Sequence, residues 1–149
     1  MKRFCCAAAA ALLLLAGCSS QKTIDSPEQL AKDLAEKITY QDELNRMEDA
    51  LATQIYGVEE VKEIWVYVGS GATAEEAAVI QLDNESAAKK ALEKVKERVD
   101  DQKSAFESYV PAEVPKLEKA VTAQYGDCVV LSVSDSPEEA QKLIEQHLK

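Results

Sequence analysis

Histidine and cysteine are scarce in this chain, which limits the chemistry that it can support. His147 is the only histidine and lies two residues from the C-terminus, so no histidine pair, zinc-type cluster or Ser-His-Asp triad can be assembled. Cys128 is the only cysteine beyond residue 18, so that part of the chain can form no internal disulfide. We expect a solvated His147, a partly buried structural thiol at Cys128, and no metal site, cofactor or catalytic residues.

Positive charge is also in short supply. The sequence has 17 lysine and arginine residues against 27 aspartate and glutamate residues, which gives a formal net charge of −10. A nucleic-acid binder needs a basic stripe, and a surface this acidic repels a polyanion. We therefore expect no nucleic-acid partner, and we expect the domain to stand off an anionic membrane surface.

Apolar runs long enough to span a bilayer are missing, but a shorter run follows the N-terminus. Lys2 and Arg3 precede about a dozen apolar residues, Phe4 to Leu15, whereas a spanning helix needs roughly 20. Positive charge, then an apolar run, then small residues is the order of an export signal. We therefore predict a signal peptide over residues 1–17.

The end of this segment, Leu15-Ala16-Gly17-Cys18, resembles the lipobox of bacterial lipoproteins. In those proteins the cysteine thiol receives a diacylglyceryl group, and the chain is cleaved just before it. The resemblance implies lipidation of Cys18, a tether over residues 18–26 and an extracytoplasmic domain over residues 27–149, anchored to the cell membrane by durable double acylation. The alternative is an ordinary signal peptide that happens to precede a cysteine.

Cap and turn residues divide the remaining chain into eight elements. The sequences Ser26-Pro27-Glu28-Gln29 and Ser136-Pro137-Glu138-Glu139 each place serine at an N-cap and proline at the first helical position, which predicts a helix through about residue 38 and a terminal helix. Helical spacing predicts a helix over 44–55, capped by Gly57, and one of about 26 residues from Asn84. Strand patterns cover residues 61–68, 77–82, 120–125 and 128–133.

This order predicts an α+β fold. We expect a four-stranded antiparallel sheet made of two β-β-α units, with helices packed on one face and two N-terminal helices before it. The long helix should overhang the sheet, because 26 residues span roughly 39 Å and a six-residue strand roughly 20 Å. We expect Phe106 and Tyr109, near its far end, to pack on the N-terminal helices around Leu34, Leu44 or Leu51.

The second face of the predicted sheet is a candidate partner surface. Strand alternation places a mixture of aromatic, apolar and polar residues there, and exposed aromatics are typical binding anchors. The proposed surface consists of Trp65, Tyr67, Val79 and Val130. The alternative is that the N-terminal segment folds over these rings through Ile38 and Tyr40 and makes a second small core.

Polar residues offer few other candidates. Gln102 interrupts the apolar stripe of the long helix, and because a buried amide needs partners we expect a structural polar contact with the backbone of residues 111–115. A ligand contact is the alternative for Gln102. Acidic pairs such as Glu75-Glu76 are expected to be solvated, with weak Ca²⁺ binding as their alternative.

Several motifs together resemble a known family. The stretch Tyr67 to Ile80 (YVGSGATAEEAAVI) is followed by Arg98, Gln102, Phe106, Tyr109-Val110-Pro111-Ala112-Glu113, Leu117 and a hairpin at Gly126. This pattern is similar to the Gram-positive lipoproteins grouped as domain of unknown function 4358, over roughly residues 37–148. The resemblance implies the same location at the membrane and the same fold, and it implies no known activity, cofactor or catalytic residue.

These observations favour a non-catalytic binding or interaction module at the cell envelope, with an unknown envelope protein or ligand as its partner. The alternatives are a carboxylate-based envelope hydrolase and a small-ligand or cation carrier. A deep cleft that holds two convergent carboxylates would favour the enzyme, and a shallow apolar face would favour the partner protein.

Overall fold

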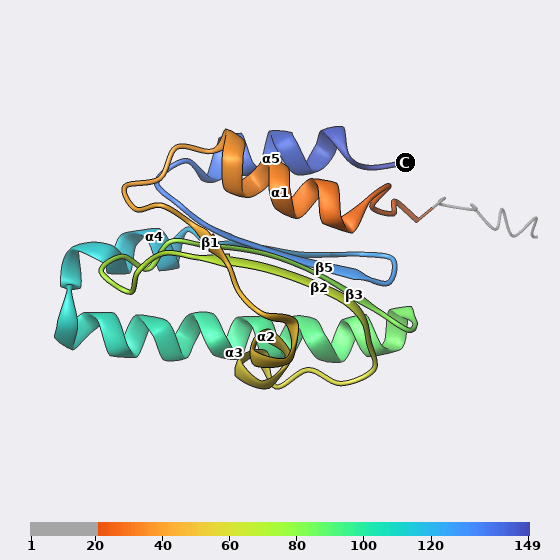
Figure 1. Ribbon diagram of the computed structural model, residues 1–149, viewed down its shortest axis with the longest axis horizontal. Helices are drawn as coiled ribbons and strands as arrows, with labels where there is room; N and C mark the ends of the chain where they lie inside the picture. The colour runs from red at the N-terminus through yellow and green to blue at the C-terminus, as the bar shows by residue number, and fades with distance from the viewer. Residues whose placement is uncertain (1–20) are drawn as a thin grey trace, which may run out of the picture.

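The computed structural model describes residues 21–149, which form one sheet between two layers of helices (Figure 1). The predicted signal peptide and Cys18 lie outside these described residues. Among residues 21–149, no helix combines the length and the apolar character needed to cross a bilayer.

The sheet is antiparallel and has the strand order β1-β2-β3-β5-β4. The two predicted hairpins, β2–β3 and β4–β5, are confirmed, and they join through β3 and β5, where Val79 lies opposite Val130. The strands are β1 Asn45–Arg46, β2 Val61–Val68, β3 Glu76–Leu82, β4 Val121–Tyr125 and β5 Cys128–Val133.

Helices cover both faces of the sheet, so the prediction of helices on one face is wrong. The helices α1 and α5 lie on one face, and α2 and α3 lie on the other (Figure 1). Both faces need a cover because the central strands β3 and β5 are apolar at successive positions, as strands buried on both sides are. The helices are α1 Pro27–Lys37, α2 Asp49–Tyr56, α3 Glu85–Tyr109, α4 Val114–Glu118 and α5 Pro137–Gln146, with a 3₁₀ turn at Pro111–Glu113.

The fifth strand, β1, occupies residues that were predicted to begin a helix. Asn45 and Arg46 pair with β2, and α2 begins only at Asp49, where the Glu48 carboxylate accepts a hydrogen bond from the N–H of Leu51. The Arg46 guanidinium holds the extended backbone in place, since it hydrogen-bonds the carbonyl oxygen of Ile64. The predicted cap at Gly57 is confirmed, with a left-handed φ of 61°.

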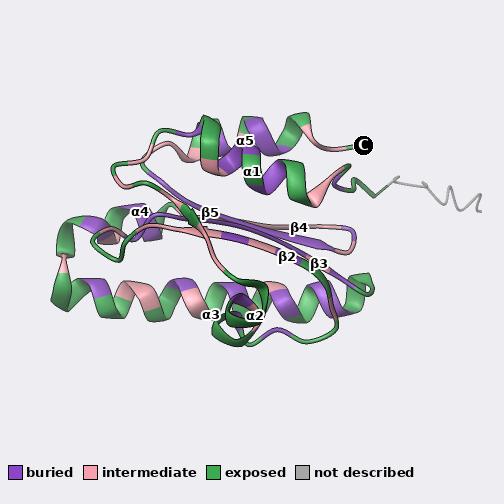
Figure 2. Ribbon diagram, viewed as in Figure 1, coloured by how far each residue is buried: buried purple, intermediate pink, exposed green. Residues whose placement is uncertain are grey.

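Each face of the sheet has its own apolar core, and the central strands β3 and β5 are buried at every position except Gln81 (Figure 2). The larger core lies under α2 and α3, and it includes Phe106 packed with Leu117 of α4. The expected packing of Phe106 and Tyr109 on the N-terminal helices is wrong. Leu34 and Leu44 belong to the core on the opposite face, Leu51 is exposed, and α4 covers the overhang of α3 instead.

The two ends of the described chain meet at one end of the molecule. Ile24 pairs with Leu148 in an antiparallel bridge, and Nε2 of His147 lies 3.0 Å from Oδ2 of Asp33. The His147 side chain is only 16% exposed, so the prediction of a solvated tail residue is wrong. The β2–β3 loop and the junction between α3 and α4 lie at the opposite end (Figure 1).

Candidate functional site

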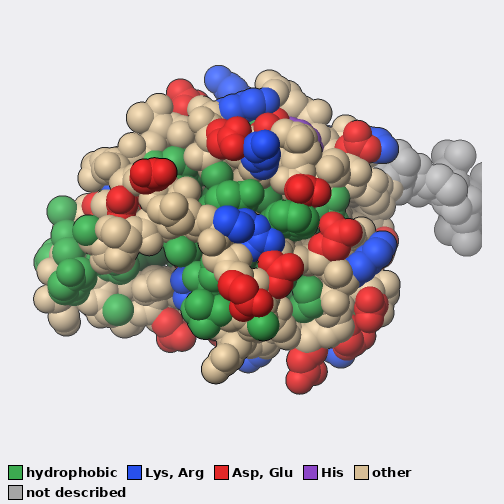
Figure 3. Space-filling view, in the orientation of Figure 1, with side chains coloured by type: hydrophobic (Ala, Val, Ile, Leu, Met, Phe, Trp, Pro, Cys, Tyr) green, Lys and Arg blue, Asp and Glu red, His purple; other side chains and the backbone are tan. Residues whose placement is uncertain are grey.

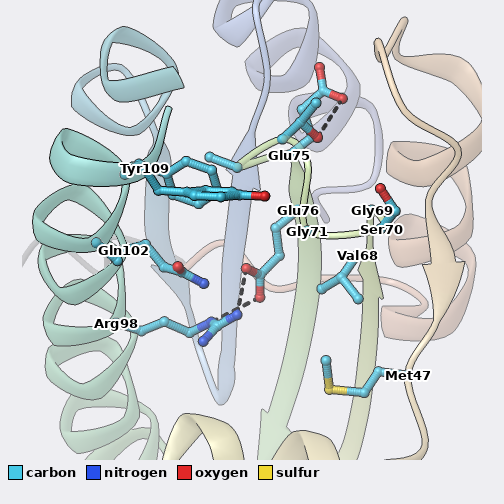
Figure 4. Close-up of a pocket in the computed structure, with 14 residues that line it drawn as sticks. Met47, Val68, Gly69, Ser70, Gly71, Glu75, Glu76, Arg98, Gln102 and Tyr109 are labelled. Carbon is cyan, nitrogen blue, oxygen red and sulfur yellow. Dashed lines mark hydrogen bonds and ion pairs between the residues drawn. The ribbon is translucent and has the colours of Figure 1, made fainter. Parts of the chain in front are cut away.

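A cavity of about 420 Å³ opens between α3 and the β2–β3 loop, residues 69–75. The side chains of Arg98, Gln102 and Tyr109 extend into it from α3, and Val68, Glu76 and the loop form the opposite wall (Figure 4). Met47 closes one side. Hydrophobic side chains also gather on the surface at the end of the molecule formed by the α3–α4 junction (Figure 3). The cavity thus combines apolar walls with a few polar groups, as small binding sites do.

Asp42 fixes the tip of the loop from outside the hairpin. Its Oδ2 accepts hydrogen bonds from both the backbone N–H and the hydroxyl of Ser70, each 2.6 Å long. These bonds lower the pKa of Asp42 below its ordinary value. A Cβ at position 69 would lie 2.7 Å from the same Asp42 oxygen, so a larger residue there would displace the Asp42 side chain.

The base of the loop is held by Glu75, whose carboxylate is fully buried. It accepts hydrogen bonds from the backbone N–H groups of Gln41 and Asp42 and from Nζ of Lys116, all at 3.0 Å. Burial alone would raise the pKa of Glu75, but these donors outweigh it and hold the pKa below its ordinary value. Lys116 also contacts Glu113 at 3.1 Å, and Glu113 accepts a hydrogen bond from the N–H of Ala74. The prediction of a solvated Glu75 is therefore wrong.

Glu76, also predicted to be solvated, is buried at the floor of the cavity. Arg98 donates to both of its oxygens, at 3.0 and 2.8 Å, in a bidentate pair that gives the carboxylate a fixed orientation (Figure 4). The Tyr56 hydroxyl donates to the same carboxylate, and the Arg98 guanidinium lies 4.9 Å from the centroid of the Tyr56 ring. Burial, together with the charge of Glu76, raises the pKa of Tyr56 well above its ordinary value.

Gln102 presents a free amide to this cavity. It is half-buried on α3 one turn after Arg98, and within residues 21–149 its side chain has no hydrogen-bond partner. The predicted structural contact with residues 111–115 is therefore wrong. Tyr109 stands at the mouth with 69% of its surface exposed, and its ring centroid lies 6.1 Å from that of the buried Phe106.

The arrangement of these groups suits binding better than acid–base catalysis. A general acid at neutral pH needs a raised carboxyl pKa, whereas the pKa of Glu75 is lowered. The Glu76 carboxylate is ion-paired with Arg98. Cys128 is buried, as expected of a structural thiol, and burial followed by the nearby Asp127 charge raises its pKa to about 12. Residues 21–149 contain no group of three or more histidine, cysteine or acidic side chains arranged to hold a metal ion.

The candidate surface predicted on the second sheet face is not open. Val79 and Val130 are completely buried beneath α1 and α5, and the alternative of a second core that includes Ile38 and Tyr40 is the one observed. Trp65 and Tyr67 are half-buried at its edge. The Arg46 guanidinium stacks over both rings, 4.5 and 5.8 Å from their centroids.

The matching family carries no assigned function. A family described as "Domain of unknown function (DUF4358)" matches residues 36–134. The chain belongs to this family. No curated protein and no solved structure matches the chain.

The DUF4358 match spans both walls of the cavity. The loop sequence and the α3 residues on which the resemblance rested, among them Gly71, Arg98, Gln102 and Tyr109, come together around it. Sequence reasoning singled out these residues but did not join them into a site. The available signal was the spacing of Arg98, Gln102, Ala105 and Tyr109, which places all four on one face of a helix.

Proposed function

We propose that this protein is a lipid-anchored binding module of the cell envelope, and that the cavity between α3 and the β2–β3 loop is its binding site. The observation that carries the proposal is the cavity itself, which has apolar walls, an unpartnered amide at Gln102 and an exposed aromatic side chain at Tyr109. Sites that bind small ligands typically have this size and this mixture of apolar walls with a few polar groups.

The rigidity of the cavity walls supports a binding role. Hydrogen bonds from Ser70, Ala74 and the Glu75 network fix the loop at its tip and at its base. A wall that is ordered before the ligand arrives loses less conformational entropy on binding, which favours affinity. A hydrolase gains no comparable support, because the two buried carboxylates that line the cavity, Glu75 and Glu76, are each paired with a cationic side chain.

The proposed anchor places the cavity away from the membrane. The carbonyl oxygen of Thr23 accepts a hydrogen bond from the N–H of Lys149, which holds Thr23 against the domain. The chain from Cys18 to Thr23 can extend at most roughly 3.5 Å per residue, so the N-terminal end of the domain would stay close to the lipid headgroups. The β2–β3 loop, which forms one wall of the cavity, lies at the other end of the molecule (Figure 1), so the cavity would face components of the envelope rather than the bilayer.

The anchor is tested by replacing the proposed lipidation site. Cys18→Ser should abolish incorporation of a palmitate analogue in cells and leave an unprocessed precursor, because the acceptor thiol is lost. The matched control is Cys128→Ser, which should keep the label because that thiol is buried in the domain. Persistent label on Cys18→Ser would contradict the lipobox interpretation.

The binding site is tested by photo-crosslinking in cells. The crosslinker p-benzoylphenylalanine at position 109, at the mouth of the cavity, should give a discrete crosslinked product. The control position is Lys89, which is exposed on the same helix but lies about 30 Å from residue 109 along its axis. Equal yields at the two positions would contradict a specific site at the cavity.

A further inference from the structure

A second hollow adjoins the cavity along α3. This hollow, of about 450 Å³, lies between the end of α2 and α3 and is lined by Ile55, Gly57, Glu97 and Asp101, among others. The two spaces share Arg98, Gln102 and Ala105. Ala105 lies where the two spaces meet, and its small, exposed side chain separates them only slightly. Because they share these three residues, the two spaces adjoin along α3 and together make an elongated groove, which fits an elongated ligand better than a compact one.

Gln102 lies at the middle of this groove. Its carboxamide offers both an N–H donor and a C=O acceptor, and neither is used within residues 21–149. A peptide group offers the complementary acceptor and donor. The shared floor of the groove is therefore matched to the backbone of an extended peptide.

The two ends of the groove differ in character. The cavity end has the apolar side chains of Met47, Val68 and Phe106, which can take a large apolar side chain. The second hollow is edged by Glu97 and Asp101, and Lys94, the lysine that lines it, is already paired with Glu97 at 2.8 Å. The uncompensated charge at that end is negative, as is the formal charge of the whole chain, −10. A basic side chain complements it.

We propose that the groove binds an extended segment of another protein, with an apolar side chain in the cavity, a peptide group on Gln102 and a basic side chain beside Asp101. The spacing agrees with this arrangement. Asp101 and Phe106, which lines the cavity, are about 7.5 Å apart along the helix axis, and side chains two residues apart in an extended peptide are separated by roughly 7 Å. The proposal rests on the binding function proposed above and names its ligand class.

The test uses the full chain in nanodiscs and fluorescein-labelled hexapeptides. Two probes carry phenylalanine and lysine two residues apart, Ser-Gly-Phe-Ser-Lys-Gly and the reversed order Ser-Gly-Lys-Ser-Phe-Gly. Two comparison peptides replace lysine with glutamate or phenylalanine with alanine. Fluorescence anisotropy, with empty nanodiscs as the blank, should detect binding of at least one phenylalanine–lysine peptide and at least about tenfold weaker binding of both comparison peptides.

Two pairs of neighbouring substitutions locate the peptide on the protein. Ala105→Leu places a large side chain where the two hollows meet and should weaken peptide binding at least about tenfold. Ser104→Leu, on the same helix but outside both hollows, should leave peptide binding unchanged. Asp101→Asn should weaken binding about two- to fivefold, as expected for one exposed ion pair, and Asp100→Asn should have no effect. All four positions are exposed, so the fold is not at risk.

The outcomes separate this inference from the proposed function. Equal binding of all four peptides, or equal effects of Ala105→Leu and Ser104→Leu, would overturn the peptide groove. If no peptide binds while residue 109 still crosslinks specifically in cells, the ligand class is wrong and the binding function stands. If neither is seen, both proposals fall.

Discussion

The network around Lys116 provides the sharpest test of how the cavity wall is held. Lys116 lies within 3.0 Å of Glu75 and 3.1 Å of Glu113, and the side chains of Lys116 and Glu75 are 3% and 0% exposed. Lys116→Met keeps a side chain of similar length but leaves two buried carboxylates without their cation. Breaking a buried pair in this way costs about 3–5 kcal/mol of unfolding free energy. The contact with Asp135 adds little, because that carboxylate is 57% exposed.

Urea unfolding of residues 21–149 at pH 7, followed by circular dichroism, measures this cost. The matched control is Lys90→Met, which breaks the exposed Lys90–Glu60 pair and should cost less than about 1 kcal/mol. A similar, small loss for both variants would refute the assignment of Lys116 to a buried network that supports the loop.

The pH dependence of the Lys116→Met effect follows from the lowered pKa of Glu75. In the wild type, the stability that this carboxylate contributes is present above its unfolded pKa, about 4.3, and is lost as pH falls through the lower folded value. In Lys116→Met the Glu75 carboxylate lacks its cation, so protonation removes an unpaired buried charge and stabilises the variant. The stability difference between the two proteins should therefore be largest near pH 7 and should narrow toward pH 4. A difference that stays constant over this range would contradict the ionic origin of the effect.

Two further predictions concern the cores. Phe106→Ala should cost about 3–5 kcal/mol in the same unfolding assay, because the ring is buried with Leu117, and a loss below about 1 kcal/mol would contradict that packing. The pKa of Cys128, raised to about 12 by burial and by Asp127, keeps the thiol protonated, so a thiol reagent at pH 8 should react slowly with the native protein and rapidly in urea. The stability that this raised pKa gives is present below the unfolded value, about 8.5, and is lost as pH rises through the folded value. Rapid reaction of the native protein would show that the thiol is accessible.

Local signals in the sequence predicted much of the fold. Ser26 and Gly57 mark helix ends through interactions that reach only a few residues, and both caps are confirmed. The two hairpins follow from strand patterns of the same short range. The second helical layer was foreseen only as an alternative, the N-terminal segment folded over that face, although β3 and β5 are apolar at successive positions and both faces needed a cover.

The candidate site depends on longer-range pairing, which local patterns do not reveal. Glu75 and Glu76 are adjacent in sequence and were predicted to be solvated. Their cationic partners, Lys116 and Arg98, follow 41 and 22 residues later. Gln102 was recognised as an unusual polar residue in an apolar stripe, but only the fold shows that its amide faces a cavity.

The central claim is that this protein binds its ligand in the groove along α3, and crosslinking at position 109 in matched backgrounds tests it most directly. The crosslinker is placed at position 109 in the wild type, in Ala105→Leu and in Ser104→Leu, and the yield of the crosslinked product in cells is compared. The leucine side chain in Ala105→Leu, placed where the two hollows meet, should reduce the crosslinking yield at least about tenfold, while the yield in Ser104→Leu should match the wild type. Equal yields in all three backgrounds would contradict the account.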